Sequence, residues 1–222
     1  MTPIRILLAD DQEGIRVAFR LILDAQPDMT VIAEAADGAT ALELACHLRP
    51  DVVLADVRMP GLDGLHLTRE LAGPAVADPI RVIVVTTFDL DEYVHTALRH
   101  GASGFLLKRS GPTLMIEAIR AAMAGDTLIS PQVTVRLLRR LSARTSATAG
   151  RPSPEVLTER ERDVARLVAT GRSNAEIAAD LHISVGTVKG HLAGIHARLA
   201  TRNRVQIAVW AHEMGMTGHE PL

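Results

Sequence analysis

Several residue types that mark particular classes of protein are scarce in this sequence. Aromatic residues make up 2% of the 222 residues, so a hydrophobic core has to be built from Leu, Ile, Val and Ala. Cys46 is the single cysteine, which excludes an internal disulfide. No apolar run approaches the roughly 18 residues of a membrane-spanning helix, and the chain turns acidic soon after Met1. We therefore expect no signal peptide, no membrane association and a cytoplasmic protein.

Lysine is also scarce, because Lys108 and Lys189 are the only two among 24 basic residues. A lysine in such a chain suggests a position that needs a compact ammonium group. Charge is unevenly distributed: residues 1–130 hold 11 Lys and Arg against 18 Asp and Glu, whereas residues 131–222 hold 13 against 8. This asymmetry suggests a metal or phosphate site in the first part and a polyanion partner for the second. Solvated arginines are the simpler alternative for the second part.

The stretch 52–56, Val-Val-Leu-Ala-Asp, is typical of a buried central strand that ends in a carboxylate. Pro60 and Gly61 follow almost directly and break any regular structure. Open α/β sheets place their chemistry at the carboxyl ends of strands, so Asp56 is a candidate functional residue. Taken alone, capping the next turn is the simpler role for this side chain.

The first 125 residues alternate strand and helix patterns five times. Strand patterns cover 4–9, 30–33, 52–55, 80–85 and 105–108. Helix patterns cover 13–25, 38–48, 63–71, 89–100 and 112–124. Short repeats of this kind predict a doubly wound, five-stranded parallel sheet with helices on both faces, as in flavodoxin-like folds.

Five polar residues fall at the ends of four of these strands: Asp10, Asp11, Asp56, Thr86 and Lys108. In a parallel sheet they converge on one edge. Three crowded carboxylates repel one another unless a cation joins them, and oxygen ligands favour Mg²⁺. One carboxylate is then placed to attack a phosphoryl group, while a cation and a hydroxyl stabilise the charge that develops on its oxygens. The convergence of these five residues favours a functional role for Asp56 over a role as the cap of a turn.

Residues 4–124 resemble a response-regulator receiver domain. The matching motifs, in order, are Asp10-Asp11, Val53–Asp56, Met59–Gly64, Val85-Thr86 and Gly101–Lys108. The resemblance implies that Asp56 accepts phosphate from a histidine kinase. It also implies that Asp11, Asp56 and the backbone carbonyl of Arg58 hold Mg²⁺, with Asp10 acting through water. Thr86 and Lys108 would contact the phosphoryl group, and Thr86 and Phe105 would act as the switch.

Two variable positions flank this site. Arg58 stands two residues after Asp56, and Phe88 stands two residues after Thr86. We hypothesise that these bulky side chains obstruct attack by water and lengthen the life of the aspartyl phosphate. The alternative is that both side chains point into solvent.

The second part of the chain begins after a segment rich in Ser, Thr, Ala, Gly, Pro and Arg. We divide the chain into a receiver domain at 1–126, a linker with a short helix at 127–155, and a small four-helix, all-α domain at 156–218. Thr158 and Glu161 match a capping box at the start of the first of these helices. Residues 157–215 resemble the LuxR-type helix-turn-helix domain of the NarL/FixJ class, in which Glu159 would tie the first helix to the second.

The resemblance also implies a set of DNA contacts. They are Ser173, Asn174, Ser184, Thr187, Val188, Lys189, Gly190, His191, Ala193 and Arg204. In helical projection, the face opposite the core stripe of the third helix carries only Gly and Ala, where the family usually has larger residues at positions 190 and 193. Either this face lets the backbone approach the groove floor, or these positions are unused and specificity is low.

His182, His191 and His196 lack the spacing and the neighbouring Cys or acids of a metal site, so they are best interpreted as surface residues. The two resemblances together indicate a DNA-binding transcriptional response regulator. Its expected partners are a sensor histidine kinase, double-stranded promoter DNA and, once phosphorylated, a second copy of the chain. One alternative is a DNA-binding regulator that acts without phosphorylation. The other is an aspartyl-phosphate phosphotransferase or phosphatase, but no substrate pocket or general acid supports an enzyme beyond Mg²⁺-dependent chemistry on Asp56 itself.

Overall fold

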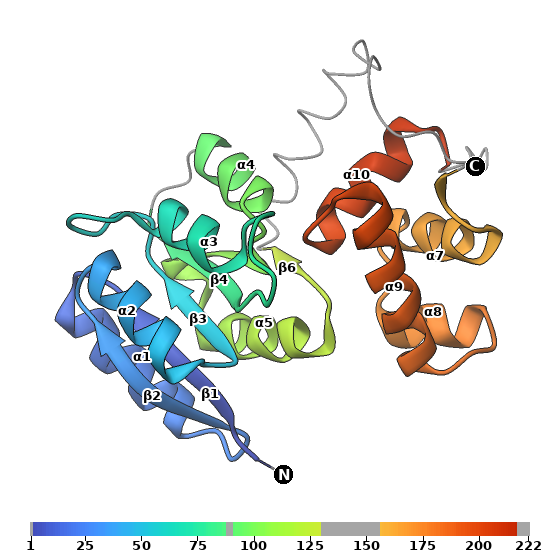
Figure 1. The fold of residues 1–222 in the computed structure, drawn as a ribbon. Helices are drawn as coiled ribbons and strands as arrows, with labels where there is room; N and C mark the ends of the chain where they lie inside the picture. The colour runs from blue at the N-terminus through green and yellow to red at the C-terminus, as the bar shows by residue number, and fades with distance from the viewer. Residues whose placement is uncertain (1, 88–90, 130–155, 217–222) are drawn as a thin grey trace.

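The computed structural model describes residues 2–87, 91–129 and 156–216, which form a sheet-containing part and a helical part (Figure 1). The strands are β1 (Ile4–Ala9), β2 (Met29–Ala35), β3 (Val52–Ala55), β4 (Arg81–Thr86), β5 (Gly104–Leu107) and β6 (Leu128–Ile129). The helices beside them are α1 (Glu13–Asp24), α2 (Gly38–Leu48), α3 (Gly64–Ala72), α4 (Asp91–Arg99), the short η1 (Lys108–Ser110) and α5 (Pro112–Ala124). The helical part contains α7 (Glu159–Ala169), α8 (Asn174–Asp180), α9 (Val185–Leu199) and α10 (Arg204–Glu213). The expected linker helix and Phe88 lie outside the described residues.

The strands pair in the order β2-β1-β3-β4-β5-β6, and every pair is parallel. This confirms the doubly wound fold, with β1 and β3 adjacent where the direction of winding reverses. Ligands bind at such a reversal, in the crevice outside the carboxyl ends of the strands. The sheet has a sixth strand that we did not predict. Leu128 and Ile129 pair with Gly104 and Phe105, and a strand of two residues is too short to leave a periodic pattern.

Strand residues alternate between two packed faces. On one face Ile6 and Leu8 of β1 pack with the apolar sides of α1 and α5, including Leu23 and Ile119. On the other face Leu7 and Ala9 pack with α2 and α3. Nearer the β5 edge, a separate cluster around the fully buried Phe105 brings in α4. Burial on both faces explains why the strands lack an alternation of polar and apolar residues.

The helical part has its own apolar core, to which all four helices contribute. Val164, Ile177, Ile195 and Trp210 represent α7, α8, α9 and α10 in this cluster. Ser173 and Ser184 are the N-caps of α8 and α9, and each side chain accepts a hydrogen bond from a backbone amide of the first turn. None of the helices that the structure describes is long and apolar enough to cross a membrane.

The capping box at the start of α7 also connects α7 to α9. Glu161 Oε2 accepts hydrogen bonds from the amide of Thr158 (2.8 Å) and its hydroxyl (2.9 Å), and Oε1 accepts one from Nε of Arg198 (3.2 Å). Burial favours the neutral acid, but the bonds from Thr158 and the charge of Arg198 outweigh it and lower the pKa of Glu161. The ionised carboxylate is therefore a stabilising element of the folded domain.

We expect Glu161→Gln to lower the free energy of unfolding by roughly 1–2 kcal/mol near neutral pH. Because the folded-state pKa is depressed, the contribution is complete above the unfolded value of 4.5 and is lost as pH falls below it. Urea unfolding of the two proteins should therefore converge toward about pH 3. The control is Glu176→Gln in the exposed capping box of α8, where we expect a smaller loss. A difference that does not change with pH would contradict the role of the charge.

Candidate functional site

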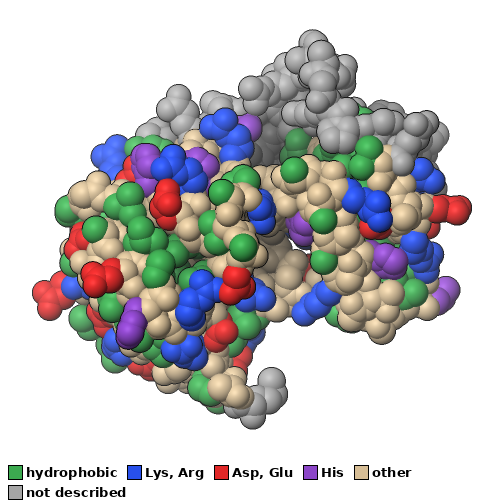
Figure 2. Space-filling model, in the orientation of Figure 1, with side chains coloured by type: hydrophobic (Ala, Val, Ile, Leu, Met, Phe, Trp, Pro, Cys, Tyr) green, Lys and Arg blue, Asp and Glu red, His purple; other side chains and the backbone are tan. Residues whose placement is uncertain are grey.

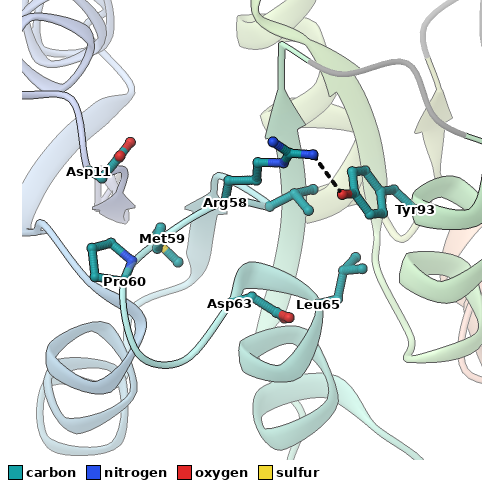
Figure 3. Close-up of a pocket in the computed structure, with 8 residues that line it drawn as sticks. Asp11, Arg58, Met59, Pro60, Asp63, Leu65 and Tyr93 are labelled. Atoms are coloured by element: carbon teal, nitrogen blue, oxygen red, sulfur yellow. Dashed lines mark hydrogen bonds between the residues drawn. The ribbon is translucent and has the colours of Figure 1, made fainter.

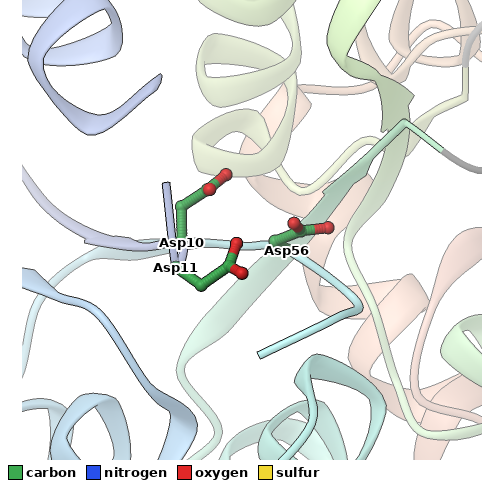
Figure 4. Close-up of side chains that lie close together, drawn as sticks. All are labelled: Asp10, Asp11 and Asp56. Atoms are coloured by element: carbon green, nitrogen blue, oxygen red, sulfur yellow. The ribbon is translucent and has the colours of Figure 1, made fainter. Parts of the chain in front are cut away.

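Three carboxylates meet at the carboxyl edge of the sheet. Asp10 and Asp11 follow β1, and Asp56 follows the neighbouring β3. The amide of Asp56 donates to the carbonyl oxygen of Ala9 (2.8 Å), so the pairing of the two strands extends to this residue. Each of the three acids offers one oxygen, and these oxygens lie within 4.8 Å of one another (Figure 4). The adjacency of β1 and β3 is thus the reason that the acids converge.

Lys108, directly after β5, supplies the positive charge of this site. Its Nζ lies 2.7 Å from Oδ2 of Asp10 and 2.8 Å from Oδ2 of Asp56, and its side chain is only 6% exposed. Burial disfavours the ammonium form, but the hydrogen bonds and charges of the two carboxylates outweigh it and raise the pKa of Lys108. Burial raises the pKa of Asp10, against the opposing effect of Lys108. The lysine therefore stays charged and partly neutralises two buried acids.

The two carboxylate oxygens of Asp56 differ in their surroundings. Oδ1 is buried and has no hydrogen-bond partner among the residues that the structure describes. Asp11, in contrast, is exposed. A buried partnerless carboxylate oxygen and a nearby exposed carboxylate fit a hard divalent cation such as Mg²⁺, which uses one or two carboxylates and keeps several waters.

The two predicted switch residues are buried on adjacent strands. Thr86 ends β4 and is fully buried, as is Phe105 on β5. Phe105 pairs with Val84 on one side and with Ile129 of β6 on the other. The predicted switch residue is thus enclosed within the sheet, beside the strand that leads out of the receiver.

A cavity of about 350 Å³ opens beside the acids. It is lined by Asp11, Val57, Arg58, Met59, Pro60, Asp63, Leu65 and Tyr93. Arg58 is exposed and extends along this cavity toward α4, where its guanidinium donates to the hydroxyl of Tyr93 (3.3 Å; Figure 3). Sequence reasoning identified Arg58 but missed Tyr93. The available signal was that Tyr93 is the single tyrosine of a chain poor in aromatic residues.

A second candidate surface lies on α8, α9 and the turn between them. Thr187, Lys189, Gly190 and Ala193 are exposed along α9, and His191 is half-buried. Ser184 is exposed, and its hydroxyl is hydrogen-bonded to that of Thr187 (2.8 Å). On the face shown in Figure 2, acidic and basic side chains are both spread over the receiver, whereas the charged side chains of the helical part are mostly basic, with histidines among them.

Three expectations for the helical part were wrong. Val188 is fully buried in the core, so it has no surface to offer to DNA. In helical projection Val185 falls on the core stripe of this helix, but it is 42% exposed, because it lies in the first turn of α9 beyond the packed face. Glu159 is exposed, and within the described residues no hydrogen bond or ion pair joins its side chain to α8. Arg160 makes that connection by donating to the carbonyl oxygen of Leu181 (2.6 Å).

The glycines of α9 have different physical causes. At Gly190 an added Cβ would meet no atom within 4 Å, and at Gly186 it would meet only Oγ of Ser184, at 3.6 Å. At Gly194 the same atom would lie 2.4 Å from Oε1 of Glu161. A side chain at position 194 would therefore displace the Glu161 carboxylate, whereas positions 186 and 190 have room for an added Cβ.

The receiver contacts two residues that were predicted to contact DNA. Asn174, 2% exposed, donates to the carbonyl oxygen of Ala124 at the end of α5 (3.1 Å). Arg204, with 10% of its side chain exposed, donates to Oδ1 of Asp126 (3.1 Å) and to Oδ1 of Asn174 (2.8 Å). Burial lowers the pKa of Arg204, opposed by the charges of Asp126 and Glu176. In this arrangement both residues are withheld from DNA.

A second contact joins α10 to α4. Nδ2 of Asn203, the N-cap residue of α10, donates to the carbonyl oxygens of Leu98 (2.8 Å) and Ala102 (3.1 Å). Nε2 of Gln206 also donates to the carbonyl oxygen of Leu98 (2.7 Å). The last carbonyls of a helix lack partners within the helix, so the helical part supplies a C-terminal cap for α4. Asn203 and Gln206 are residues that no sequence pattern singled out.

A doubly wound sheet with acids at its reversal point, joined to a small domain of four helices, is the architecture of a receiver joined to a helix-turn-helix domain. Comparison with known families agrees. Residues 6–120 match the response regulator receiver domain, and residues 155–211 match the bacterial regulatory proteins of the luxR family.

Similar proteins cover nearly the whole chain. The transcriptional regulatory protein LiaR of Bacillus subtilis is 40% identical, over 94% of this chain and 97% of LiaR. The nitrate/nitrite response regulator protein NarL of Escherichia coli is 36% identical, over 95% and 96%. The structure of the response regulator ChrA of a haem-sensing two-component system has a TM-score of 0.53 at 34% identity, over 97% of this chain and 100% of ChrA. The chain belongs to the DNA-binding response regulators of two-component systems, in the group with a LuxR-type domain.

Proposed function

We propose that Asp56 accepts a phosphoryl group from a sensor histidine kinase and that this modification controls promoter binding by the helical domain. One observation carries the proposal. The Asp56 carboxylate has Oδ2 bound to Lys108, while Oδ1 is left without a hydrogen-bond partner among the described residues. An oxygen in this state is available for bond formation, and the lysine beside it balances the charge of the carboxylate.

In the transfer, Oδ1 of Asp56 forms a bond to phosphorus while the bond from phosphorus to the histidine nitrogen breaks. The electron pair of that bond stays with the imidazole. Lys108 neutralises negative charge on the phosphoryl oxygens, and the Thr86 hydroxyl donates a hydrogen bond to one of them. Attack by water on phosphorus later releases inorganic phosphate and restores the carboxylate.

Asp11, Asp56 and the backbone carbonyl of Arg58 would hold Mg²⁺ directly. Asp10, already bound to Lys108, suits an indirect role through water. When bound, the ion neutralises charge on the transferring phosphoryl group. The close grouping of three carboxylates supports this assignment.

The test is incubation of the protein with phosphoramidate and Mg²⁺, followed by mass measurement. We expect one added phosphoryl group, lost in Asp56→Asn and absent when a chelator removes the metal. The matched control is Asp63→Asn, which removes a neighbouring carboxylate outside the trio and keeps a good N-cap for α3. Unchanged labelling of Asp56→Asn would contradict the proposal. Multiple turnover on an added phosphorylated substrate would indicate an enzyme instead.

We propose that phosphorylation separates the two domains. The supporting contact is the ion pair between Asp126 and Arg204, in which a receiver carboxylate occupies a guanidinium that we expect to contact a DNA phosphate. A DNA phosphate and Asp126 then compete for the same cation. Because the two contacts exclude each other, a change that weakens the interface by a given free energy favours DNA binding by the same amount.

Asp126→Asn should raise the DNA affinity of the unphosphorylated protein roughly five- to tenfold, because it removes the charge that competes for Arg204. The phosphorylated protein should change little. Fluorescence anisotropy with promoter DNA measures both states. Asp28→Asn is the control, since Asp28 is paired with Arg120 within the receiver. An equal gain in the two variants would show a general effect of charge and contradict the competition.

We propose that Thr187 and Lys189 bind DNA phosphates, with Ser173, Ser184 and His191 beside them, and that Gly190 and Ala193 let the backbone of α9 approach the groove floor. The open space around Gly190 supports this, because protein packing does not account for glycine there. An interior glycine costs about 1 kcal/mol of helix stability relative to alanine. Specificity would then depend on DNA shape and on thymine methyl groups against Ala193.

Gly190→Ala should raise the thermal stability of the domain and weaken specific DNA binding roughly fivefold or more, since the methyl group separates helix and groove. Gly194→Ala is the comparison variant, because it makes the same change on α9 at a position where the methyl group meets Glu161 of the same domain. Binding and melting are measured on the same preparations. Unchanged or tighter binding of Gly190→Ala would overturn the close-approach hypothesis in favour of unused positions.

We further propose the division into a receiver at 1–126, a linker at 127–155 and a DNA-binding domain at 156–218. Phosphorylated chains would pair as two-fold dimers, because helix-turn-helix dimers bind paired half-sites about one helical turn apart. A cytoplasmic location remains our prediction from the sequence.

A further inference from the structure

Arg16 of α1 binds the turn that carries Asp10 and Asp11. Its Nη1 donates to the backbone carbonyl oxygen of Asp10 (2.8 Å), and its Nε donates to Oε2 of Glu34 on β2 (3.3 Å). Only 14% of the Arg16 side chain is exposed. One planar guanidinium thus joins the acid turn to the neighbouring strand, and the phosphoryl transfer described above does not use it.

The carbonyl group that Arg16 binds belongs to the peptide unit that joins Asp10 to Asp11. A peptide unit is planar, so fixing its carbonyl also fixes its amide and restricts the torsion angles on both sides. Asp10 is held further by its amide, which donates to the carbonyl oxygen of Ala35 (3.1 Å). Asp11 is exposed, and in Figure 4 its carboxylate points toward Asp56. The bond from Arg16 therefore restricts the direction in which the Asp11 carboxylate is presented.

The positive charge of Arg16 lies close to the acid cluster, because Arg16 and Asp56 line the same narrow gap. An uncompensated cation there would oppose the binding of a divalent ion. Glu34, however, pairs with Arg16 and also with Arg20, which lies one turn further along α1. The paired guanidinium therefore serves the site mainly as a directional hydrogen-bond donor.

We propose that Arg16 is a positioning residue that holds Asp11 in the orientation that a divalent cation requires. Mg²⁺ demands near-ideal octahedral geometry, so rotation of one carboxylate lowers its affinity even when every ligand is present. Arg16 acts through the peptide unit between Asp10 and Asp11, and not as a ligand of the ion. This inference rests on the proposed metal site of Asp11 and Asp56.

Arg20 provides a matched control on the same helix. It binds the same carboxylate as Arg16, but its Nη1 donates to the carbonyl oxygen of Val31 (3.2 Å), within β2 and away from the acid turn. Arg16→Gln and Arg20→Gln each remove one positive charge and one ion pair with Glu34. Only Arg16→Gln also releases the carbonyl of Asp10.

Mg²⁺ affinity is measured by titration calorimetry, and the rate of phosphorylation by phosphoramidate is measured over a range of Mg²⁺ concentrations. In Arg16→Gln, Mg²⁺ should bind roughly tenfold more weakly, because the peptide unit before Asp11 is free to rotate. Phosphorylation at saturating Mg²⁺ should stay within about twofold of the unaltered protein, since every reacting group is still present. Arg20→Gln should match the unaltered protein in both measurements.

Arg16→Lys separates the charge of Arg16 from its geometry. It keeps the positive charge, but its single nitrogen cannot bind both the Asp10 carbonyl and Glu34 as the planar fork does. We expect Mg²⁺ to bind roughly three- to tenfold more weakly than in the unaltered protein. Thermal melting of each variant checks its fold, and Arg16→Lys is the milder substitution if Arg16→Gln unfolds.

Unchanged or tighter Mg²⁺ binding in the Arg16 variants would overturn the inference. An equal loss in Arg20→Gln would also overturn it, because the effect would then come from the packing or charge of α1. A phosphorylation rate of Arg16→Gln that stays low at saturating Mg²⁺ would place Arg16 in the transfer itself and contradict a positioning role. If the unaltered protein binds no Mg²⁺, the proposed metal site fails, and this inference fails with it.

Discussion

The acidic edge of the receiver sheet places Asp10 and Asp56 side by side in a buried setting, where like charges repel strongly. Lys108 is the counterion, at 2.7 and 2.8 Å from the two carboxylates, and its own burial is tolerated because both acids support its charge. The lysine binds Oδ2 of Asp56, and Oδ1 has no hydrogen-bond partner in the part of the chain that the structure describes. The chemistry proposed for the site depends on this division of one carboxylate into a bound oxygen and a free one.

The contact between the domains repeats the same electrostatic pattern with the charges exchanged. There the largely buried Arg204 pairs with one carboxylate, Asp126, and its second terminal nitrogen has no hydrogen-bond partner among the described residues. Asp126 lies two residues before Leu128, which pairs with Gly104 of β5 next to the predicted switch residue Phe105. The end of the receiver is therefore bound to the switch strand at one point and to the DNA-binding domain at another. Only a few residues separate these two points of attachment, so the chain connects the switch strand directly to the interdomain contact.

Local signals in the sequence were sufficient for much of the fold and part of the site. The apolar runs before Asp10, Asp56 and Lys108 predicted buried parallel strands, and parallel strands bring their ends to one edge. The capping box of Thr158 and Glu161 follows from four consecutive residues and is present. In contrast, β6 is too short for a periodic pattern, and the DNA contact that the family resemblance implied for Val188 does not fit its burial in the core.

The sequence by itself determined which chemical groups gather at the sheet edge, because strand direction and residue order settle that question locally. Only the tertiary structure decided what each group contacts. Arg58 lies near Tyr93 because α3 and α4 pack on the same face of the sheet, and Arg204 pairs with Asp126 because the domains dock. Such contacts join residues far apart in the chain, and their formation depends on packing geometry that no local pattern encodes.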